Sequence, residues 1–402
     1  PQQFNDIAFS ADDEFIIAAT DDNRIAFWDT ETGNSVKLIN TDMTNISAIT
    51  ADRTSRIIAV ANNKTIEFWD SRNGEKRLEL SGESRAVKSL DVSSDNRFLS
   101  IGCEEQALVW NLITGKIVSQ PIEKQNNKDV IFNPQESSEL ALAGKNTIEV
   151  YSFIQNQKKK SVSRQGNIFT ALDFRIDGKY LASGNFGGIV QYWEIVPKER
   201  DEMMRTFHGH KGAVFDVKVS PDGKYIASAG KDRTVKIWDI ENNRLHKTLV
   251  AHTDEVWSVA FSNNGHFLAS GGCDKNVIIW DTKNWEVVHR MTGHRDYVKD
   301  LCFSADDNIV ASASWDNTIK IWNPISGELL RTLTGHSNYV QTLAFSANNA
   351  FLYSGGNDNQ VKVWNLLSGR ELLSLMVFPN GRDYVITTPK GFFDGTSEAI
   401  NS

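Results

Sequence analysis

Four sets of histidine, serine, aspartate and tryptophan recur in the second half of the chain at constant offsets. In each set the serine follows the histidine by 18 residues, the aspartate by 22 and the tryptophan by 28, and successive sets lie 42 residues apart. The sets are His210, Ser228, Asp232 and Trp238; His252, Ser270, Asp274 and Trp280; His294, Ser312, Asp316 and Trp322; and His336, Ser354, Asp358 and Trp364. Serine, histidine and aspartate are also the residue types of the hydrolase triad, in which the histidine activates the serine hydroxyl. The sequence therefore raises the question of whether any of these sets is catalytic.

The same spacing runs through the whole chain. Aromatic residues that close a short β-branched run stand at Trp28, Trp69, Trp110, Tyr151, Trp193, Trp238, Trp280, Trp322 and Trp364. The steps between them are 41, 41, 41, 42, 45, 42, 42 and 42 residues. Nine copies at a nearly constant period indicate a repeat architecture.

Each repeat predicts four short β-strands. In the repeat around Trp280, the predicted strands are residues 256–261, 266–270, 276–281 and 286–292. Period-two alternation and β-branched residues favour strands, and Gly, Asn and Asp mark the breaks between them. The last of the four segments is the most polar, so we expect it to lie outermost. The predicted fold class is all-β.

The order Gly-His, Ser, Asp and Trp-Asp within the repeats resembles the WD-repeat β-propeller family, from about residue 4 to residue 378. The resemblance implies four-stranded blades around a central channel. Nine repeats predict a single propeller of nine blades, with eight blades as the alternative. Degenerate repeats (blades 1–5) would occupy residues 1–205 and regular repeats (blades 6–9) residues 206–378 of the same propeller, with a tail at 379–402.

The first and last repeats predict how the two ends of the chain close the ring. Residues 4–10 align with an innermost strand, so the chain has no N-terminal outer strand to donate. We therefore expect the ring to close without strand exchange, with residues 371–378 as the outer strand of the last blade.

The resemblance also implies a structural role for the four polar sets. In the family these side chains form a buried hydrogen-bond chain that links the strands of one blade. Four copies suit a fold, whereas an active site needs one, so we predict no catalytic residue and no enzyme activity, with a propeller hydrolase as the remote alternative. The first five repeats are expected to lack the network. Ala18 and Ala59 stand at the serine position, Asn63 and Gly187 at the aspartate position, and Tyr151 replaces a tryptophan.

Large aromatic residues gather where the resemblance places the mouth of the channel. The start of the innermost strand and the turn before the third strand meet on that face. The residues predicted there are Phe215, Glu255, Trp257, Tyr297, Lys299, Trp315 and Tyr339. Exposed aromatic residues suit the recognition of a protein or peptide ligand. The alternative is that these rings only pack against neighbouring blades and plug the channel. Nearby charges are mixed, which leaves the polarity of the partner open.

The composition excludes several classes of function. Lys and Arg number 43 against 51 Asp and Glu, a net charge of −8, which argues against a general nucleic-acid or anionic-membrane binder. No run approaches the roughly 18 apolar residues of a membrane-spanning helix. Cys103, Cys273 and Cys302 have no metal-type or paired spacing and predict reduced thiols in a cytoplasmic protein. We expect no cofactor, no metal, no membrane and no nucleic acid.

The tail at 379–402 departs from the repeat pattern. Tyr384-Val385, Thr388-Pro389 and Gly391-Phe392-Phe393-Asp394-Gly395 resemble the segment after the propeller in bacterial proteins that fuse WD repeats to a caspase-like protease domain. The chain has no initiator Met, and we expect a piece of a longer protein. The predicted function is a non-catalytic interaction scaffold, the sensor or regulatory propeller of such a protein. The alternatives are a stand-alone adaptor or a propeller attached to a signalling ATPase or kinase.

Replacing Asp316 by asparagine separates the structural and catalytic interpretations of the polar sets. If the set is structural, breaking one link should lower the free energy of unfolding by about 1–3 kcal/mol, visible by calorimetry as a lower melting temperature. Loss of an ester- or peptide-hydrolysis activity at unchanged stability would contradict the structural interpretation.

Overall fold

The computed structural model describes most of the chain as β-strands joined by turns. The residues described are 4–9, 14–20, 22–41, 43, 46, 48–51, 57–61, 65–71, 73–81, 86–103, 106–118, 122–123, 128–195, 203–377, 384–389 and 393–395. The chain divides into two compact units. Unit 1 comprises residues 1–85 and 371–402, and unit 2 comprises residues 86–370.

Unit 1 contains two four-stranded antiparallel sheets and three C-terminal strands. The first sheet has the order β1 (Phe4–Phe9), β2 (Phe15–Thr20), β3 (Arg24–Asp29) and β4 (Ser35–Asn40). The second has the order β5 (Ala48–Ala51), β6 (Ile57–Ala61), β7 (Thr65–Asp70) and β8 (Lys76–Ser81). A shared core that includes Ile17, Phe27, Ile49 and Trp69 joins the two sheets. At the C-terminus β36 (Arg370–Val377), β37 (Tyr384–Thr387) and β38 (Phe393–Gly395) pair antiparallel in that order.

Unit 2 is built from seven successive sheets. The first sheet contains β9 (Val87–Val92), β10 (Phe98–Cys103), β11 (Gln106–Asn111), β12 (Lys116–Ile117) and β13 (Ile122–Glu123). The second sheet contains β14 (Asp129–Phe132), β15 (Glu139–Ala143), β16 (Lys145–Ser152) and the first part of β17 (Gln157–Phe174). The third sheet contains the rest of β17, β18 (Tyr180–Asn185), β19 (Ile189–Glu194) and β20 (Met203–His208). The long strand β17 serves both the second and the third sheet.

The last four sheets of unit 2 carry the regular repeats. The fourth sheet contains β21 (Val214–Val219), β22 (Tyr225–Gly230), β23 (Val235–Asp239) and β24 (Arg244–Leu249), and the fifth contains β25 (Val256–Phe261), β26 (Phe267–Gly272), β27 (Val277–Asp281) and β28 (Glu286–Met291). The sixth sheet contains β29 (Val298–Phe303), β30 (Val310–Ser314), β31 (Thr318–Trp322) and β32 (Leu329–Thr334). The seventh contains β33 (Val340–Phe345), β34 (Phe351–Gly356) and β35 (Gln360–Asn365). These strands agree with the four predicted for the repeat around Trp280 to within two residues at each end.

The turn chemistry of the repeats explains why each hairpin forms. Gly223, Gly265, Asp307 and Asn349 occupy the same place between the first and second strands of successive sheets, with φ of 70°, 72°, 59° and 56°. Glycine adopts this left-handed conformation without a Cβ clash, and Asn and Asp tolerate it better than other residues. The strands on either side are therefore held at hairpin distance by the local sequence alone.

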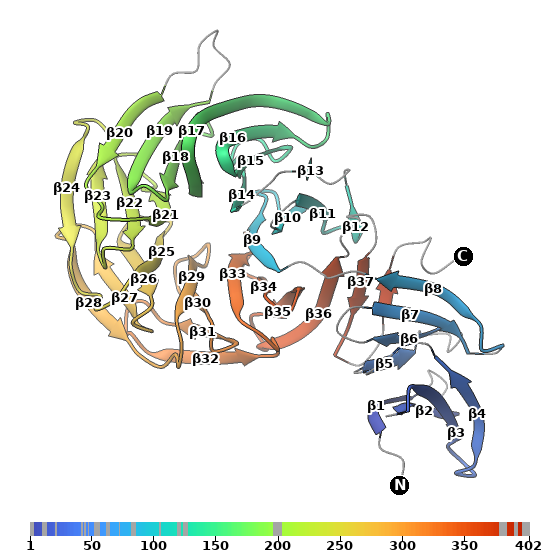
Figure 1. The fold of residues 1–402 in the computed structure, drawn as a ribbon. Coiled ribbons are helices and arrows are strands. Elements are labelled where there is room, and N and C mark those ends of the chain that lie inside the picture. The colour runs from blue at the N-terminus through green and yellow to red at the C-terminus, as the bar shows by residue number, and fades with distance from the viewer. Residues whose placement is uncertain are drawn as a thin grey trace. The chain divides into compact units, whose positions relative to one another are not determined.

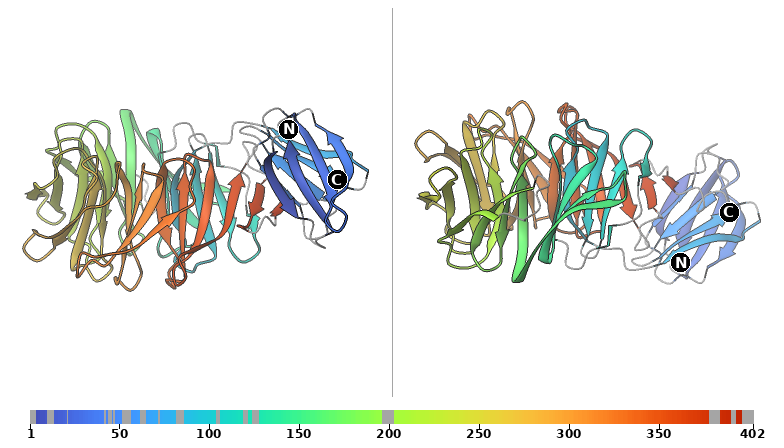
Figure 2. Two further views of the ribbon diagram at one scale, coloured as in Figure 1. Left: turned by 90° about the horizontal axis from the view of Figure 1, so that it is seen from below. Right: turned by 90° about the horizontal axis from the view of Figure 1, so that it is seen from above.

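The seven sheets of unit 2 form a closed ring (Figure 1). The first strand of each sheet lies innermost, and the innermost strands contact one another in the order β9, β14, β17, β21, β25, β29, β33 and back to β9. Figure 2 shows the ring from its edge, with the strands running between its two faces. Each apolar core lies between two successive sheets, as where Ala227 and Ile237 meet Val256 and Leu268.

The single ring of nine blades predicted from the repeat count, and its eight-bladed alternative, are not confirmed. Unit 2 closes over seven sheets, because β33 packs beside β9. A repeat period counts sheets but carries no information about which two sheets meet at closure. The strand predicted at residues 371–378 forms as β36, whereas the residues before Phe4, on which the test for strand exchange depends, lie outside the described residues.

Side-chain hydrogen bonds cross every junction between neighbouring sheets of the ring. The bonds, in ring order, are Phe132 N to Asp91 Oδ2 at 2.7 Å, Leu172 N to Asp129 Oδ2 at 2.8 Å, Val219 N to Asp173 Oδ2 at 2.7 Å, Val259 N to Asp216 Oδ2 at 3.0 Å, Ser258 Oγ to Asp300 Oδ1 at 3.3 Å, Leu343 N to Asp300 Oδ2 at 2.8 Å, and Leu90 N to Thr342 Oγ1 at 3.1 Å. The last of these closes the ring across 252 residues of sequence. These seven bonds are called the inter-sheet bonds below.

Replacing Thr342 by valine should weaken the closing junction. The substitution keeps the shape of the side chain but leaves the buried Leu90 N–H without its acceptor, which costs about 1–3 kcal/mol. Urea unfolding followed by circular dichroism measures this loss. The matched control is Thr292→Val at an exposed residue; an equal effect in the two variants would show that the closing bond contributes nothing specific.

Candidate functional site

The four polar sets are hydrogen-bonded as chains within their sheets. In the first chain His210 Nε2 lies 2.7 Å from Ser228 Oγ, the Trp238 indole donates to the same oxygen at 2.8 Å, and His210 Nδ1 lies 2.9 Å from Asp232. The other three chains repeat these contacts with distances of 2.7–3.0 Å. All four serines are completely buried. Each hydroxyl is thus held between an imidazole and an indole, away from any substrate.

The backbone near each chain must approach the histidine closely. A Cβ added at Gly230 would lie 2.3 Å from His210 Nδ1, and one at Gly356 would lie 2.7 Å from His336 Nδ1. Only glycine avoids this overlap without moving the ring. The glycine that precedes the aspartate turn in these two sheets is therefore part of the polar network.

Three of the aspartates at the ends of the chains, Asp232, Asp274 and Asp316, have lowered pKa values. Burial by itself would raise the pKa of Asp232, but hydrogen bonds from His210, Thr234 and the Lys211 amide outweigh burial and hold the pKa far below its usual range. The same balance, with His252 as the main donor, lowers the pKa of Asp274 to about 2. The network is therefore a charged, fully engaged structural element.

Two of the repeats that lack the complete network still contain polar links to their tryptophans. The Trp193 indole donates to Ser183 Oγ at 2.8 Å, so the fifth repeat keeps the serine–tryptophan half of the network. The complete network of four residues is absent from this repeat, since Gly187 stands at the aspartate position. In unit 1 the Trp69 indole donates to Glu67 at 3.0 Å, and Glu67 pairs with Lys76 at 3.1 Å. The sequence did not suggest Glu67, because its position differs from that of the serine in the regular repeats.

The aromatic residues predicted at the channel mouth form one continuous cluster in unit 2. The ring centroids lie 6.1 Å apart for Phe215 and Trp257, 5.4 Å for Trp257 and Tyr297, and 4.9 Å for Trp257 and Trp315. Trp315 and Tyr339 stack with 4.8 Å between centroids and 8° between planes. Five rings from four neighbouring sheets thus touch in an unbroken series, which we call the aromatic cluster.

The aromatic cluster is only partly covered by the rest of the protein. Tyr339 is 37% exposed, and the other four rings are half-buried. The Trp257 indole donates to Glu255 at 3.2 Å, and Lys299 Nζ lies 5.2 Å from the centre of the Trp257 ring. The Trp315 Nε1 atom is buried and has no hydrogen-bond partner in the described part of the structure. All seven residues of the predicted binding face therefore lie around one mouth; that a partner binds there stays a prediction.

Two apolar residues that the sequence analysis missed extend this face into the third sheet. Ile168 is 36% exposed and Phe186 is 58% exposed. The Phe186 amide donates to the Ile168 carbonyl at 2.9 Å, as the Lys231 amide does to Ala213 at 2.8 Å. Their positions thus correspond to the predicted binding positions of the next sheet. Extending the alignment of the regular repeats back to the fifth repeat would have found them.

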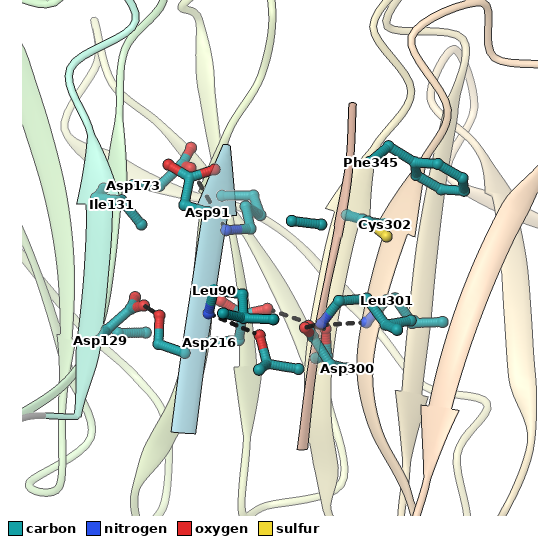
Figure 3. A pocket seen from close by; sticks show the side chains of 18 of the residues that line it. Leu90, Asp91, Asp129, Ile131, Asp173, Asp216, Asp300, Leu301, Cys302 and Phe345 are labelled. Carbon is teal, nitrogen blue, oxygen red and sulfur yellow. Dashed lines mark hydrogen bonds and ion pairs between the residues drawn. The ribbon is translucent and has the colours of Figure 1, made fainter. Parts of the chain in front are cut away.

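The channel below the aromatic cluster has acidic walls (Figure 3). It forms a cavity of about 420 Å³ whose mouth includes Phe215 and Trp257. The carboxylates of the inter-sheet bonds line it at two levels, with Asp91 and Asp173 at one and Asp129, Asp216 and Asp300 at the other. Lys218 Nζ lies 3.5 Å from Asp173.

Burial raises the pKa of four wall carboxyl groups, those of Asp91, Asp129, Asp173 and Asp300. It raises the pKa of Asp91 to about 7 and those of Asp173 and Asp300 to about 6, although the amide donors of the next sheet act in the opposite direction. The Lys218 ammonium is also disfavoured by burial, but the surrounding carboxylates outweigh that effect and raise its pKa. Lys218 therefore stays charged while part of the wall titrates near neutral pH.

The remaining motifs give no second candidate site. Cys103, Cys273 and Cys302 are free thiols, and burial raises the pKa of Cys273 to about 12. Lys158 pairs with Glu149 at 3.0 Å on the outer hairpin. The described residues contain no cluster of three or more metal-ligating side chains, and none of their helices has the length and apolar character that a membrane crossing requires.

Two motifs singled out in the sequence fall partly outside the described residues. Of the tail motif, Tyr384 and Val385 lie in β37, whereas Gly391 and Phe392 are not described. Residues 197–205, a charged insertion that lengthens the step between Trp193 and Trp238 to 45 residues, are also described only from residue 203 onward.

Comparison with known proteins agrees with this geometry. The family model "WD domain, G-beta repeat" matches residues 2–29, 201–239, 243–281, 285–323 and 327–365. The chain therefore contains WD repeats, and four of the five matches fall on the sheets that carry the complete polar chains. The degenerate repeats between residues 30 and 200 are not matched.

Similar relatives cover parts of the chain. The WD repeat-containing protein SL1-17 of Schistosoma mansoni is 27% identical over 42% of this chain and 55% of that protein. The U3 small nucleolar RNA-associated protein 12 of Saccharomyces cerevisiae is 22% identical over 43% of this chain and 20% of that protein. The F-box-like/WD repeat-containing protein TBL1X of Mus musculus is 40% identical over 17% of this chain and 12% of that protein. The chain spans about half or less of the length of each. All three are eukaryotic, and their names do not point to the caspase-like fusion that the tail suggests.

The wall carboxylates predict how the stability of the protein depends on pH. A carboxyl group whose pKa is higher in the folded than in the unfolded chain, where it is about 3.9, stabilises the fold at low pH and loses that contribution as the pH rises through the folded value. Because the pKa of Asp300 in the folded chain is about 6, its contribution to the free energy of unfolding should be lost mainly between about pH 4 and pH 7.

Urea unfolding at about pH 4.5, 6 and 7.5 measures this dependence across the window that the two pKa values set. The variant Asp300→Asn should have a shallower pH dependence than the parent chain, whereas Glu328→Gln at an exposed outer turn should leave it unchanged. The same pH dependence in the parent chain and in Asp300→Asn would contradict the assignment.

Proposed function

We propose that this chain is a non-catalytic protein-interaction scaffold that binds a protein or peptide segment on the aromatic cluster of unit 2. The observation that carries the proposal is the unbroken contact of five aromatic rings, from Phe215 to Tyr339, at one mouth of the channel. Tryptophan and tyrosine supply most of the binding energy in protein interfaces, because a large rigid ring buries much area at little entropic cost.

The frame beneath the aromatic cluster supports this function. Each ring comes from a strand start or turn that is fixed by a polar chain within its sheet and by an inter-sheet bond to its neighbour. A surface that is already rigid loses little conformational freedom on binding, so more of the contact energy appears as affinity. The rings can therefore act as anchors without first being ordered by the partner.

The same geometry argues against catalysis at the polar chains. A serine nucleophile must reach a substrate carbonyl, and Ser228, Ser270, Ser312 and Ser354 are fully buried and bonded on both sides. Several relatives are named for their WD repeats, the repeat type that the resemblance associates with protein interaction. One relative is named as RNA-associated, but the net charge of −8 favours a protein partner for this chain.

The cellular context is proposed from weaker signals. The reduced thiols support a cytoplasmic protein. The tail supports a sensor propeller attached to a caspase-like protease, with a signalling ATPase or kinase, or no attached domain, as alternatives. The coding sequence beyond Ser402 tests this context: a domain with a His–Cys pair supports the protease, and a stop codon near Ser402 supports a stand-alone adaptor.

Replacing Trp257 and Tyr297 together by alanine should abolish binding without unfolding the chain. Peptides selected from a phage-displayed library on the purified chain provide the ligands, and fluorescence polarisation measures their affinity. We expect a loss of about 2–4 kcal/mol for two central anchors, with an unchanged circular dichroism spectrum. The matched control is Tyr225→Ala, which removes an aromatic residue from an apolar core away from the mouth. Peptides that bind the double variant as tightly as the parent chain would exclude this site.

A further inference from the structure

The exposed charges around the aromatic cluster are mainly positive, although the whole chain carries a net charge of −8. We considered the three sheets from β21 to β32, at the end where the aromatic cluster lies. Six cationic residues stand there, namely Lys211, Lys231, Arg233, Lys275, Arg295 and Lys299. All except the half-buried Lys299 are exposed.

The backbone places these cations at the mouth. The Lys231 amide donates to Ala213, at the start of an innermost strand, and the Lys211 and Arg295 amides donate to the aspartates Asp232 and Asp316 of the polar chains. Lys275 Nζ donates to the Arg295 carbonyl at 2.8 Å, so one sheet reaches across to the next. The cations therefore border the same rings that form the aromatic cluster.

Outside the polar chains, three acidic side chains lie at this end, and they are half-buried and engaged within the protein. Asp254 accepts the Glu255 amide at 2.8 Å, and Asp296 accepts the Tyr297 amide at 2.8 Å. Glu255 accepts the Trp257 indole at 3.2 Å and lies 3.9 Å from Lys231 Nζ. The carboxylates of the polar chains are at most 10% exposed and fully hydrogen-bonded. A partner that approaches this face thus meets ammonium and guanidinium groups more than carboxylates.

We propose that the partner of the aromatic cluster is an acidic peptide segment, in which aspartate or glutamate residues flank a large apolar side chain. The apolar side chain would pack on Trp257, Trp315 and Tyr339, and the flanking carboxylates would pair with Lys211, Arg295 and their neighbours. This inference rests on the proposed function and adds the charge of the ligand to it. Complementary charge of this kind speeds association and selects among partners.

The channel itself argues for a short segment lying across the mouth. The walls below the mouth carry five aspartates, so a polyanion that threaded into the channel would meet like charge. Six cations are also few compared with the extended basic surface that a nucleic acid requires. A few carboxylates around one apolar anchor match the area and the charge that are present.

Binding of defined probes to the full chain tests this inference. The first probe is a fluorescein-labelled peptide with one tryptophan flanked by three glutamates on each side, and the second has glutamines in place of the glutamates. We expect the glutamate probe to bind roughly tenfold more tightly or better, a preference that shrinks as salt is raised. The double variant Lys211→Glu/Arg295→Glu should abolish the preference.

The controls separate charge from folding and from the aromatic anchor. Lys283→Glu reverses an exposed charge in the β27–β28 turn, at the other end of its sheet, and should keep the preference. Equal affinity for the two peptides, no binding of the glutamate peptide at about millimolar concentration, or tighter binding of an oligouridylate of equal charge would each overturn the inference. If the glutamine peptide binds as well as the glutamate peptide and Trp257→Ala/Tyr297→Ala loses both, the proposed function stands and only the acidic partner fails.

Discussion

The ring of unit 2 depends on hydrogen bonds that its innermost strands make with one another. Neighbouring sheets share no strand ladder across most junctions, so packing alone would leave polar backbone groups unpaired around the channel. A carboxylate or hydroxyl on one strand accepts an amide of the next, as Asp216 does from Val259. Buried donors that lose such a partner cost about 1–3 kcal/mol each. Six junctions are linked in this way, and at the junction between β25 and β29 the Ser258 hydroxyl donates to Asp300. Together these links join the separate sheets into one closed frame.

The polar chains solve a different problem within each sheet. They connect an innermost loop, the second strand and the third strand, as His210, Ser228 and Trp238 do. Their repetition in four sheets coincides with the repeats that the WD family model matches. The third sheet keeps only Ser183 and Trp193, so it relies more on apolar packing. The two sets of bonds act in perpendicular directions, one along each sheet and one around the ring.

In this ring, the residues that stabilise the fold differ from the residues that are exposed at the channel mouth. Residues that satisfy the polar chains and the inter-sheet bonds are committed to the fold, including every serine and histidine that resembles catalytic chemistry. Those bonds position the strand starts and turns at the mouth, but the aromatic side chains at these positions do not take part in the polar chains or the inter-sheet bonds. Trp257, Tyr297 and Tyr339 lie at such positions, and the proposed binding function rests on them.

The sequence by itself determined the strands, the repeat period, the four polar chains and the gathering of the aromatic residues. All of these follow from local alternation, turn chemistry and constant offsets, which act over one repeat. The tertiary structure alone decided that seven sheets close the ring, because the contact between Leu90 and Thr342 joins residues far apart in the chain. It also decided that Glu67 replaces serine as the partner of an indole and that Phe186 joins the exposed face. A contact between residues far apart in the chain, and a residue type that differs from the one in the other repeats, do not appear in the repeat pattern. The sequence therefore could not predict them.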